Sequence, residues 1–290
     1  MKNSNRILLI FCLPAFLLYS TFVLYPALGG FWYSLTNWNG LDPTYGDYVG
    51  FSNYKELLGD ENFKQSLLFT SKYVIYMVIL QNIIALLLAV IIESFEKTKN
   101  VFRTIFFFPN MISMIVGGFI WLFIFTRVFP YLADTIGLMI LDESWIGNPQ
   151  YSFYSILILS LWGSVGYLMI IYIAALQNIP KQLLEAARID GASKLQINWH
   201  IVRPLIANSI TIGVFIALST SFKVFDQVYA LTGGGPGRAT QVVSLNIFSE
   251  AFAMQSRFGY ASAKAVVLFV LILGITLIQL LVMKRKEVEM

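Results

Sequence analysis

Uncharged and mostly apolar stretches alternate along the chain with short charged segments. Each stretch reaches or nearly reaches the roughly 20 residues that an α-helix needs to cross a bilayer. The pattern therefore predicts an all-α polytopic membrane protein with six transmembrane helices, in which the long first and fourth stretches also contain turn residues outside the span. The six stretches comprise residues 7–41, 73–92, 104–126, 144–180, 204–222 and 265–283.

The composition excludes the water-soluble classes of protein. Apolar residues make up 57% of the chain and charged residues 12%, whereas soluble domains average about 25% charged residues. The single cysteine, Cys12, lies in the first stretch and has no second cysteine with which to form a disulfide. Because that stretch is much longer than the roughly 7 to 15 apolar residues of a signal peptide, we expect it to be a retained first span.

The distribution of Lys and Arg favours a cytoplasmic location for both chain ends. This orientation places 12 of these residues on the inner side and 8 on the outer side, as the positive-inside rule requires. The basic residues are spread over separate inner segments, so the net charge of +4 does not indicate a nucleic-acid partner. We expect one membrane domain over residues 1–290, with an inner loop at about 178–204. Outer loops are expected at about 39–66, 127–150 and 226–258.

The residue types needed for catalysis are scarce. The chain has one histidine and one cysteine, and no proposed span contains a carboxylate, so the spans cannot supply a nucleophile with its base or a metal cluster. We therefore expect a protein without enzymatic activity, and a membrane-embedded enzyme is the weakest alternative. The glycine-rich segment 231–240 lacks the spacing of a P-loop and predicts a tight turn with positive φ angles.

The middle of each proposed span is free of ionisable residues. Lys72, Lys223 and Lys264 all lie near predicted span ends. Ion-coupled carriers usually place an ionisable residue near the bilayer midplane, so this pattern argues against the main alternative for a transport protein, an ion-coupled secondary carrier. The energy for any active transport would then have to come from another chain.

One charged segment, residues 183–204, stands between the fourth and fifth stretches. Pro180 suits the first turn of a helix that is expected to end at Gly191, and Ser193 can cap a second short helix. The segment therefore predicts a helix–glycine–helix knuckle at the inner face. Two interpretations remain open: a connector on the lipid surface, or a docking element whose Glu185 makes a charge-assisted bond to a partner protein.

The charged segment resembles part of a known family. The sequence EAARIDGA at 185–192, followed by Gln196, Ile201 and Pro204, resembles the EAA loop of permease subunits of binding-protein-dependent ABC importers. Further segments, which extend the resemblance over nearly the whole chain, look like the carbohydrate-importer branch and its MalF-like subunit type. They are PAFLLYSTFVLYPALGGFWYSLTNW from Pro14, VGFSNYKELLGDENF from Val49, FDQVYALTGGGP from Phe225 and FGYASAKAVVLF from Phe258.

The resemblance implies a permease subunit of an ATP-driven importer of a sugar or oligosaccharide, in the cytoplasmic membrane of a bacterium or archaeon. It implies a second, similar permease subunit, two ATPase subunits that hold ATP and Mg, and an extracytoplasmic sugar-binding protein, with no cofactor on this chain. The chain would form half of the translocation path and transmit ATPase motion by alternating access. The residues implied in ATPase coupling are Glu185, Ala186, Ala187, Gly191 and Pro204.

The second half of the EAA segment departs from the family pattern. The family often has an aromatic residue where this chain has Asn198, and Leu-Pro where it has Arg203 and Pro204. Family contacts are therefore not carried over to Asn198 and Arg203.

Polar and aromatic side chains mark a candidate substrate path. Ser160, Ser164 and Tyr167 follow one another at helical spacing in the fourth stretch. Thr220 and Ser221 lie near the end of the fifth. Sugars are bound through hydroxyl and amide hydrogen bonds and aromatic faces, which suits these residue types. Small polar residues that pack one helix against another would produce the same pattern.

Overall fold

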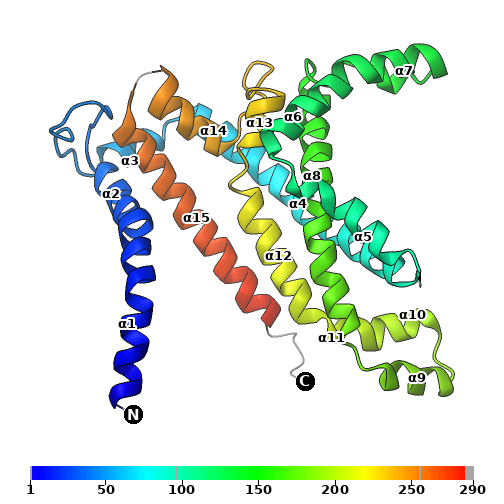
Figure 1. Cartoon of the computed structure of the whole chain (residues 1–290). Helices are drawn as coiled ribbons and strands as arrows, with labels where there is room; N and C mark the ends of the chain where they lie inside the picture. The colour runs from blue at the N-terminus through cyan, green and yellow to red at the C-terminus, as the bar shows by residue number, and fades with distance from the viewer. Residues whose placement is uncertain (1, 96, 255, 285–290) are drawn as a thin grey trace. The chain divides into compact units, whose positions relative to one another are not determined.

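The protein is built from helices (Figure 1). The computed structural model describes residues 2–95, 97–254 and 256–284, and within these the regular structure is helical apart from one isolated bridge between Thr36 and Tyr48. The all-α prediction is therefore confirmed. Five helical segments are long and apolar enough to cross a membrane. They are Phe11–Tyr33, Glu61–Glu93, Met114–Ile136, Pro149–Gln177 and Phe258–Lys284.

A bent pair of helices brings the number of candidate spans to the predicted six if the pair is counted as one broken span. The segment Leu195–Leu205 meets α12 (Ala207–Ser221) at an angle of 68°, and the break falls at Ile206. Pro204 lies two residues before the break and has no N–H group to donate, which removes a helical hydrogen bond at this position. Most of the fifth apolar stretch therefore lies in α12, and the residues before it run in another direction.

The third span begins later than the hydrophobic pattern predicts. Within the stretch 104–126, the backbone leaves the helical region at Ile112, where ψ is 133°, and α6 (Met114–Phe123) starts after this break. Pro109 lies in the short 3-10 turn that precedes it. The helix then continues beyond the predicted stretch through η3 (Ile124–Val128) and α7 (Phe129–Ile136).

The chain divides into two compact units. One consists of Met1–Phe63 with Asn246–Leu271, and the other of Lys64–Leu245 with Ile272–Met290. The single membrane domain expected over residues 1–290 stays a prediction.

A buried asparagine holds part of the first unit together. Asn53 Nδ2 donates to the backbone carbonyl groups of Ser34 and Thr36, over 2.9 and 2.8 Å. Carbonyl groups at the end of a helix lack intrahelical partners, so this side chain satisfies the backbone just after α2 ends. The helices of this unit are α1 (Lys2–Tyr19), η1 (Ser20–Leu24), α2 (Tyr25–Tyr33), α3 (Ser52–Leu57), η6 (Ser249–Met254) and the first part of α15 (Phe258–Lys284).

The core of the second unit lies between α4, α8 and α12. Ala85, Ala89 and Ala217 are fully buried there beside Tyr172. Small side chains let membrane helices approach closely, and a Cβ added at Gly213 would lie only 2.1 Å from Tyr172 Oη. Besides α6, η3, α7, α12 and the end of α15, the helices lying wholly or partly in this unit are α4 (Glu61–Glu93), α5 (Lys99–Phe107), η2 (Phe108–Met111), η4 (Met139–Leu141), α8 (Pro149–Gln177), α9 (Lys181–Ile189), α10 (Lys194–Ile197), η5 (Asn198–Val202), α11 (Arg203–Leu205), α13 (Asp226–Leu231) and α14 (Val243–Phe248).

Neighbouring segments reach the backbone of α8 directly. Gln81 Nε2 of α4 donates to the carbonyl group of Ser164, and Asn110 Nδ2 donates to that of Gly163, each over 3.2 Å. On the same part of α8, a Cβ at Gly166 would lie 2.1 Å from the backbone oxygen of Phe106. The middle of α8 is therefore fixed by close backbone contact.

Replacing Gly166 with alanine is expected to destabilise the protein. The new Cβ would meet backbone atoms, which cannot turn aside as a flexible side chain can. Overpacking of this kind costs about 1–3 kcal/mol. Thermal unfolding of the detergent-solubilised protein measures the loss. Gly274→Ala in α15 is the matched control, because a Cβ there has no atom within 4 Å, and equal stability of the two variants would contradict the close contact at Gly166.

Candidate functional site

The charged segment forms the knuckle that the sequence predicts, made of α9, α10, η5 and α11 (residues 181–205). The first of these helices, α9, ends at Ile189, and the chain turns at Gly191 as expected, where the φ of +80° favours glycine. The Gly191 N–H donates to the carbonyl group of Arg188 over 3.1 Å, and the Ala192 N–H donates to that of Ala187 over 2.9 Å. These two bonds close the end of α9 and turn the chain.

The second half of the knuckle begins with a reciprocal cap. The Ser193 N–H donates to Gln196 Oε1 over 2.8 Å, and the Gln196 N–H donates to Ser193 Oγ over 3.4 Å. This pair of bonds is a capping box, and it starts α10 at Lys194. The knuckle is thus defined by local interactions at both of its helix boundaries.

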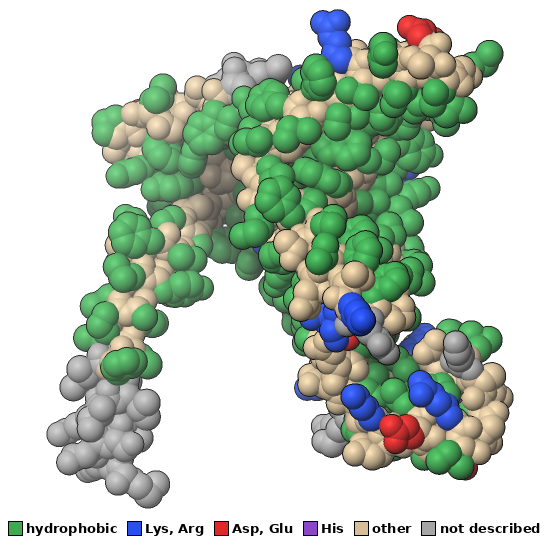
Figure 2. All heavy atoms as spheres, turned by 45° about the vertical axis from the view of Figure 1, so that its right-hand side comes forward, with side chains coloured by type: hydrophobic (Ala, Val, Ile, Leu, Met, Phe, Trp, Pro, Cys, Tyr) green, Lys and Arg blue, Asp and Glu red, His purple; other side chains and the backbone are tan. Residues whose placement is uncertain are grey.

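The knuckle carries charged and large apolar side chains together on its surface. Glu185, Ala186 and Gly191 are exposed. Ile189 is 86% exposed and Leu195 76% exposed. Figure 2 shows blue and red side chains gathered on the lobe that the knuckle forms, below a largely green surface. A mixed surface of this kind is typical of a site that contacts another protein.

The other two residues of the predicted coupling set lie closer to the rest of the unit. Ala187 and Pro204 are each partly buried. Ala187 also accepts one of the bonds that close α9, and Pro204 lies next to the bend at Ile206. The predicted coupling residues therefore occupy one continuous knuckle.

A polar contact ties the helices above the knuckle to one another. Glu93 at the end of α4 forms an ion pair with Arg103 of α5 and accepts a hydrogen bond from Gln177 over 3.1 Å. Gln177 is the last residue of α8, only three positions before Pro180. The ends of α4, α5 and α8 are thereby linked immediately before the chain enters the knuckle.

The structure separates the candidate substrate residues of α8. Ser160 is 1% exposed and its hydroxyl donates to the carbonyl group of Ile156 over 2.8 Å. Ser164 is partly buried and donates to the carbonyl group of Ser160 over 2.6 Å. Tyr167, in contrast, is 42% exposed. Both serines bond to their own helix, and Tyr167 is the one member of this stripe with a large accessible surface.

Thr220 and Ser221, near the end of α12, differ in the same way. Thr220 is exposed and its hydroxyl donates to the carbonyl group of Ile216 over 2.8 Å, whereas Ser221 is 4% exposed. Adjacent helical residues point about 100° apart, so the two side chains cannot line one surface equally.

The glycine-rich segment adopts the predicted tight turn. Gly233, Gly234 and Gly237 have φ values of +58°, +86° and +56°. A buried side chain stabilises the turn, because the hydroxyl of Thr240 donates to the carbonyl group of Gly235 over 2.6 Å.

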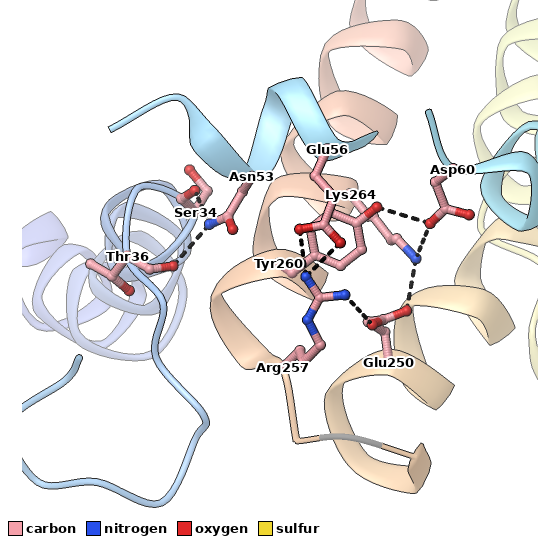
Figure 3. A network of polar contacts seen from close by, with 9 residues as sticks. All are labelled: Ser34, Thr36, Asn53, Glu56, Asp60, Glu250, Arg257, Tyr260 and Lys264. Atoms are coloured by element: carbon pink, nitrogen blue, oxygen red, sulfur yellow. Dashed lines mark hydrogen bonds and ion pairs between the residues drawn. The ribbon is translucent and has the colours of Figure 1, made fainter. Parts of the chain in front are cut away.

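A buried ion cluster in the first unit was not predicted from the sequence (Figure 3). Lys264 of α15 is fully buried, and its Nζ lies 2.9 Å from Asp60 Oδ2 and 2.9 Å from Glu250 Oε2. It also donates to Asn246 Oδ1 over 2.9 Å. The ammonium group has three N–H donors, and these contacts give each of them an acceptor.

Arg257 and Tyr260 extend this ion cluster to the surface. Two carboxylate oxygens of Glu56 lie 2.6 and 2.7 Å from Arg257 Nη2, and Glu250 lies 3.3 Å from Nη1. The Tyr260 ring lies 4.2 Å from the Arg257 guanidinium and 4.6 Å from Lys264 Nζ. Each cation therefore has both a carboxylate and an aromatic face beside it.

The ion cluster holds Asp60 in its charged form. Burial by itself would raise the pKa of Asp60, but hydrogen bonds from Lys264, the Phe63 N–H and Tyr260 outweigh burial and lower the pKa below its ordinary value. A lowered pKa stabilises the fold above the unfolded-state value of about 3.9. This contribution is lost only as the pH falls through that value toward the folded-state pKa. Asp60 therefore contributes fully at neutral pH.

The sequence spacing indicates that three members of the ion cluster lie close together, but it does not reveal their carboxylate partners. Arg257, Tyr260 and Lys264 follow at intervals of three and four residues, which places them on one side of a helix start. Asp60 and Glu250 lie in segments that hydropathy assigns to outer loops, and a single sequence gives no sign that those segments meet Lys264.

The sequence matches the family model for the binding-protein-dependent transport system inner membrane component over residues 81–288. It is also similar to the probable starch degradation products transport system permease protein AmyD of Thermoanaerobacterium thermosulfurigenes. The two are 38% identical over 281 residues, which covers 97% of this chain and 95% of that protein. The resemblance carried by the EAA segment is therefore confirmed along nearly the whole chain.

The fold is similar to chains in two crystal structures of bacterial alginate transporters. One transporter is involved in the import of the acidic polysaccharide alginate, and the match has a TM-score of 0.84 at 22% identity, covering 98% of this chain and 96% of that chain. The other is in complex with an alginate pentasaccharide-bound periplasmic protein, and its match has a TM-score of 0.82 at 22% identity, covering 96% and 93%. These matches confirm the helical architecture.

Lys264→Met is expected to lower the thermal stability of the detergent-solubilised protein, because Asp60 would lose its buried cation. Removing one partner of a buried ion pair costs about 3 kcal/mol or more. The double variant with Asp60→Asn should recover part of the loss, since one uncompensated charge is gone. Lys55→Met, at an exposed lysine of α3, is the control, and equal losses at Lys55 and Lys264 would contradict the importance of the ion cluster.

Proposed function

Because the chain belongs to the family of binding-protein-dependent transport system inner membrane components, we propose that it is a permease subunit of an ATP-driven importer of a sugar or oligosaccharide. Carbohydrate is favoured because AmyD is named for starch degradation products and the structural neighbours are transporters of alginate. The observation that carries the proposal is the exposed knuckle. An ATP-driven permease whose own sequence has no P-loop receives its energy from a separate ATPase chain, and the knuckle offers a surface for that chain.

The proposed complex contains four kinds of chain. A second, similar permease completes the translocation path, two ATPase subunits bind at the cytoplasmic side, and a sugar-binding protein docks at the outer side. The complex of the alginate transporter with its periplasmic protein supports the last of these partners. ATP and Mg are held by the ATPase subunits, and this chain needs no cofactor of its own.

In this proposal the knuckle docks into a cleft of an ATPase subunit. Glu185 is exposed and available for a charge-assisted bond to a Lys or Arg of the partner. Ala186 and Ala187 allow the partner backbone to approach closely, and Gly191 provides the turn between the two helical halves. Pro204 ends the knuckle where the fifth span begins.

The connections of the knuckle support a mechanical role. It follows directly after α8 and leads into α12 through the bend at Ile206, so a force on the knuckle acts on the fourth and fifth spans. The Glu93 contacts pass that force to α4 and α5. We propose that this motion alternates access to the path, with the knuckle and both chain termini in the cytoplasm and the chain in a bacterial or archaeal cytoplasmic membrane.

Tyr167 and Thr220 are the preferred candidates for the substrate path. Both are exposed, whereas Ser160 and Ser221 are buried and Ser164 is partly buried. Aromatic faces and hydroxyl groups are the groups that bind sugars. The three serines then act by packing helices together, and any contact they make with substrate would need the helices to separate.

Reconstitution in proteoliposomes tests the coupling role. With the ATPase subunits and the binding protein present, sugar uptake should require ATP. Glu185→Lys should reduce substrate-stimulated ATP hydrolysis about tenfold or more, because a hydrogen bond to a charged group contributes about 1.5–3 kcal/mol.

Glu143→Lys is the control for this variant. It makes the same change of charge at an exposed residue in the predicted outer loop, and hydrolysis should stay at the wild-type rate. Uptake without ATPase subunits would favour an ion-coupled carrier, and normal hydrolysis in the Glu185 variant would rule out its coupling role.

Tyr167→Ala should raise the sugar concentration needed for half-maximal uptake about three- to tenfold, since an aromatic contact contributes about 0.5–1.5 kcal/mol. Tyr154→Ala is the matched control: Tyr154 lies on the same helix and is 43% exposed, against 42% for Tyr167. It points about 140° away around the helix axis at 3.6 residues per turn. Equal effects of the two variants would argue against a substrate contact at Tyr167.

A further inference from the structure

A groove lies beside the bend between the knuckle and the fifth span. Its volume is about 370 Å³. It is bordered by the last part of the knuckle, the first turns of α12 and the end of α15, all within the second unit. One polar edge faces an apolar wall. The edge consists of Trp199 and Arg203, and the wall includes Ala207, Ile210, Val282 and Met283.

Arg203 brings a positive charge to this groove. Its guanidinium carbon lies 4.2 Å from the centre of the Trp199 ring. Arg203 is exposed, and none of the ion pairs found among the described residues involves it. Stacking occupies the face of a guanidinium group but leaves the N–H donors at its edge available for two parallel bonds to a phosphate or carboxylate.

The bend places this charge where the charged knuckle meets the apolar helix α12. The chain turns by 68° at Ile206, from the knuckle into α12. Arg203 precedes the turn by three residues, and Trp199 precedes it by seven. Trp and basic residues concentrate at the level of lipid headgroups. Lys284, in the last turn of α15, adds a second positive charge directly after Val282 and Met283, which line the groove.

The apolar wall continues onto a surface suited to hydrocarbon. Val282 and Leu281 of α15 are 55% and 68% exposed, and Ile212 of α12 is 44% exposed. A free phosphate ion would gain nothing from such a wall. A lipid acyl chain would bury apolar surface along it, at about 25 cal/mol for each Å².

We propose that this groove binds one molecule of an anionic phospholipid. Its phosphate group accepts hydrogen bonds from the edge of Arg203, and one acyl chain lies along Ile210 and Val282. The lipid would join the start of α12 to the end of α15, next to the knuckle. Headgroup charge would thereby influence the segment through which ATPase motion is proposed to pass. Lipid binding requires only that the chain spans a membrane, so a negative result for lipid binding would not contradict the proposed transport function, or the reverse.

Lipid binding is tested on the full chain, purified in detergent with its partner subunits. Native mass spectrometry measures the binding of dioleoylphosphatidylglycerol and dioleoylphosphatidylcholine. The anionic lipid should bind at least about fivefold more tightly, and Arg203→Ala should reduce its affinity by about fivefold, the effect of one basic residue near a lipid surface. Ile210→Trp, which fills the groove and keeps the charge, should also weaken binding of the anionic lipid.

Arg127→Ala is the matched control, an exposed arginine in η3 whose removal should leave the affinity unchanged. Thermal unfolding shows whether each variant is folded, and Arg203→Gln replaces Arg203→Ala if that variant is not. Three results would overturn the proposal. The first is equal affinity for the two lipids, and the second is competition by the deacylated headgroup glycerophosphoglycerol that equals competition by the intact anionic lipid. The third is Arg203-dependent binding to the isolated chain that is absent in the complete complex, because a partner subunit would then cover the groove.

Discussion

Exclusion of charge from the hydrocarbon core decides where the polar contacts of this protein lie. Glu93 meets Arg103 at the end of α4, and Lys264 meets its carboxylates near the start of α15. Along α8, polar groups serve the backbone: Gln81 donates to a carbonyl group, and the Ser160 hydroxyl donates within its own helix. Close packing of the spans therefore depends on small side chains and on polar groups that bond to the backbone.

The two charged regions of the protein differ in what they leave available. In the ion cluster, carboxylates and cations satisfy one another, and Lys264 has no accessible surface. In the knuckle, Glu185 and Arg203 are exposed. A cluster of buried, mutually paired charges holds together the segments that supply it, whereas exposed charges are available to bind another molecule. The ion cluster therefore stabilises the first unit, and the knuckle leaves exposed the two groups that we propose contact a protein, at Glu185, and a lipid, at Arg203.

Local rules predicted much of the fold. Hydropathy found the spans because a membrane helix depends on its own composition, and the stop at Gly191 followed from the conformational freedom of glycine. The start of the third span was misplaced because hydropathy averages over the break that follows Pro109. The burial of Ser160 depends on how α8 packs, and the surroundings of Lys264 depend on segments far away in the sequence. Neither can be obtained from spacing alone.

The ion cluster also bears on how the protein is made. Glu56 and Arg257 are 201 positions apart. Synthesis proceeds from the N-terminus, so Glu56 and Asp60 emerge long before Arg257 and Lys264. Until then these two carboxylates lack the cations that neutralise them. The segment 257–264 therefore supplies the charges that neutralise two carboxylates made about 200 positions earlier, so this part of the first unit reaches its folded charge state only after most of the chain has been synthesised.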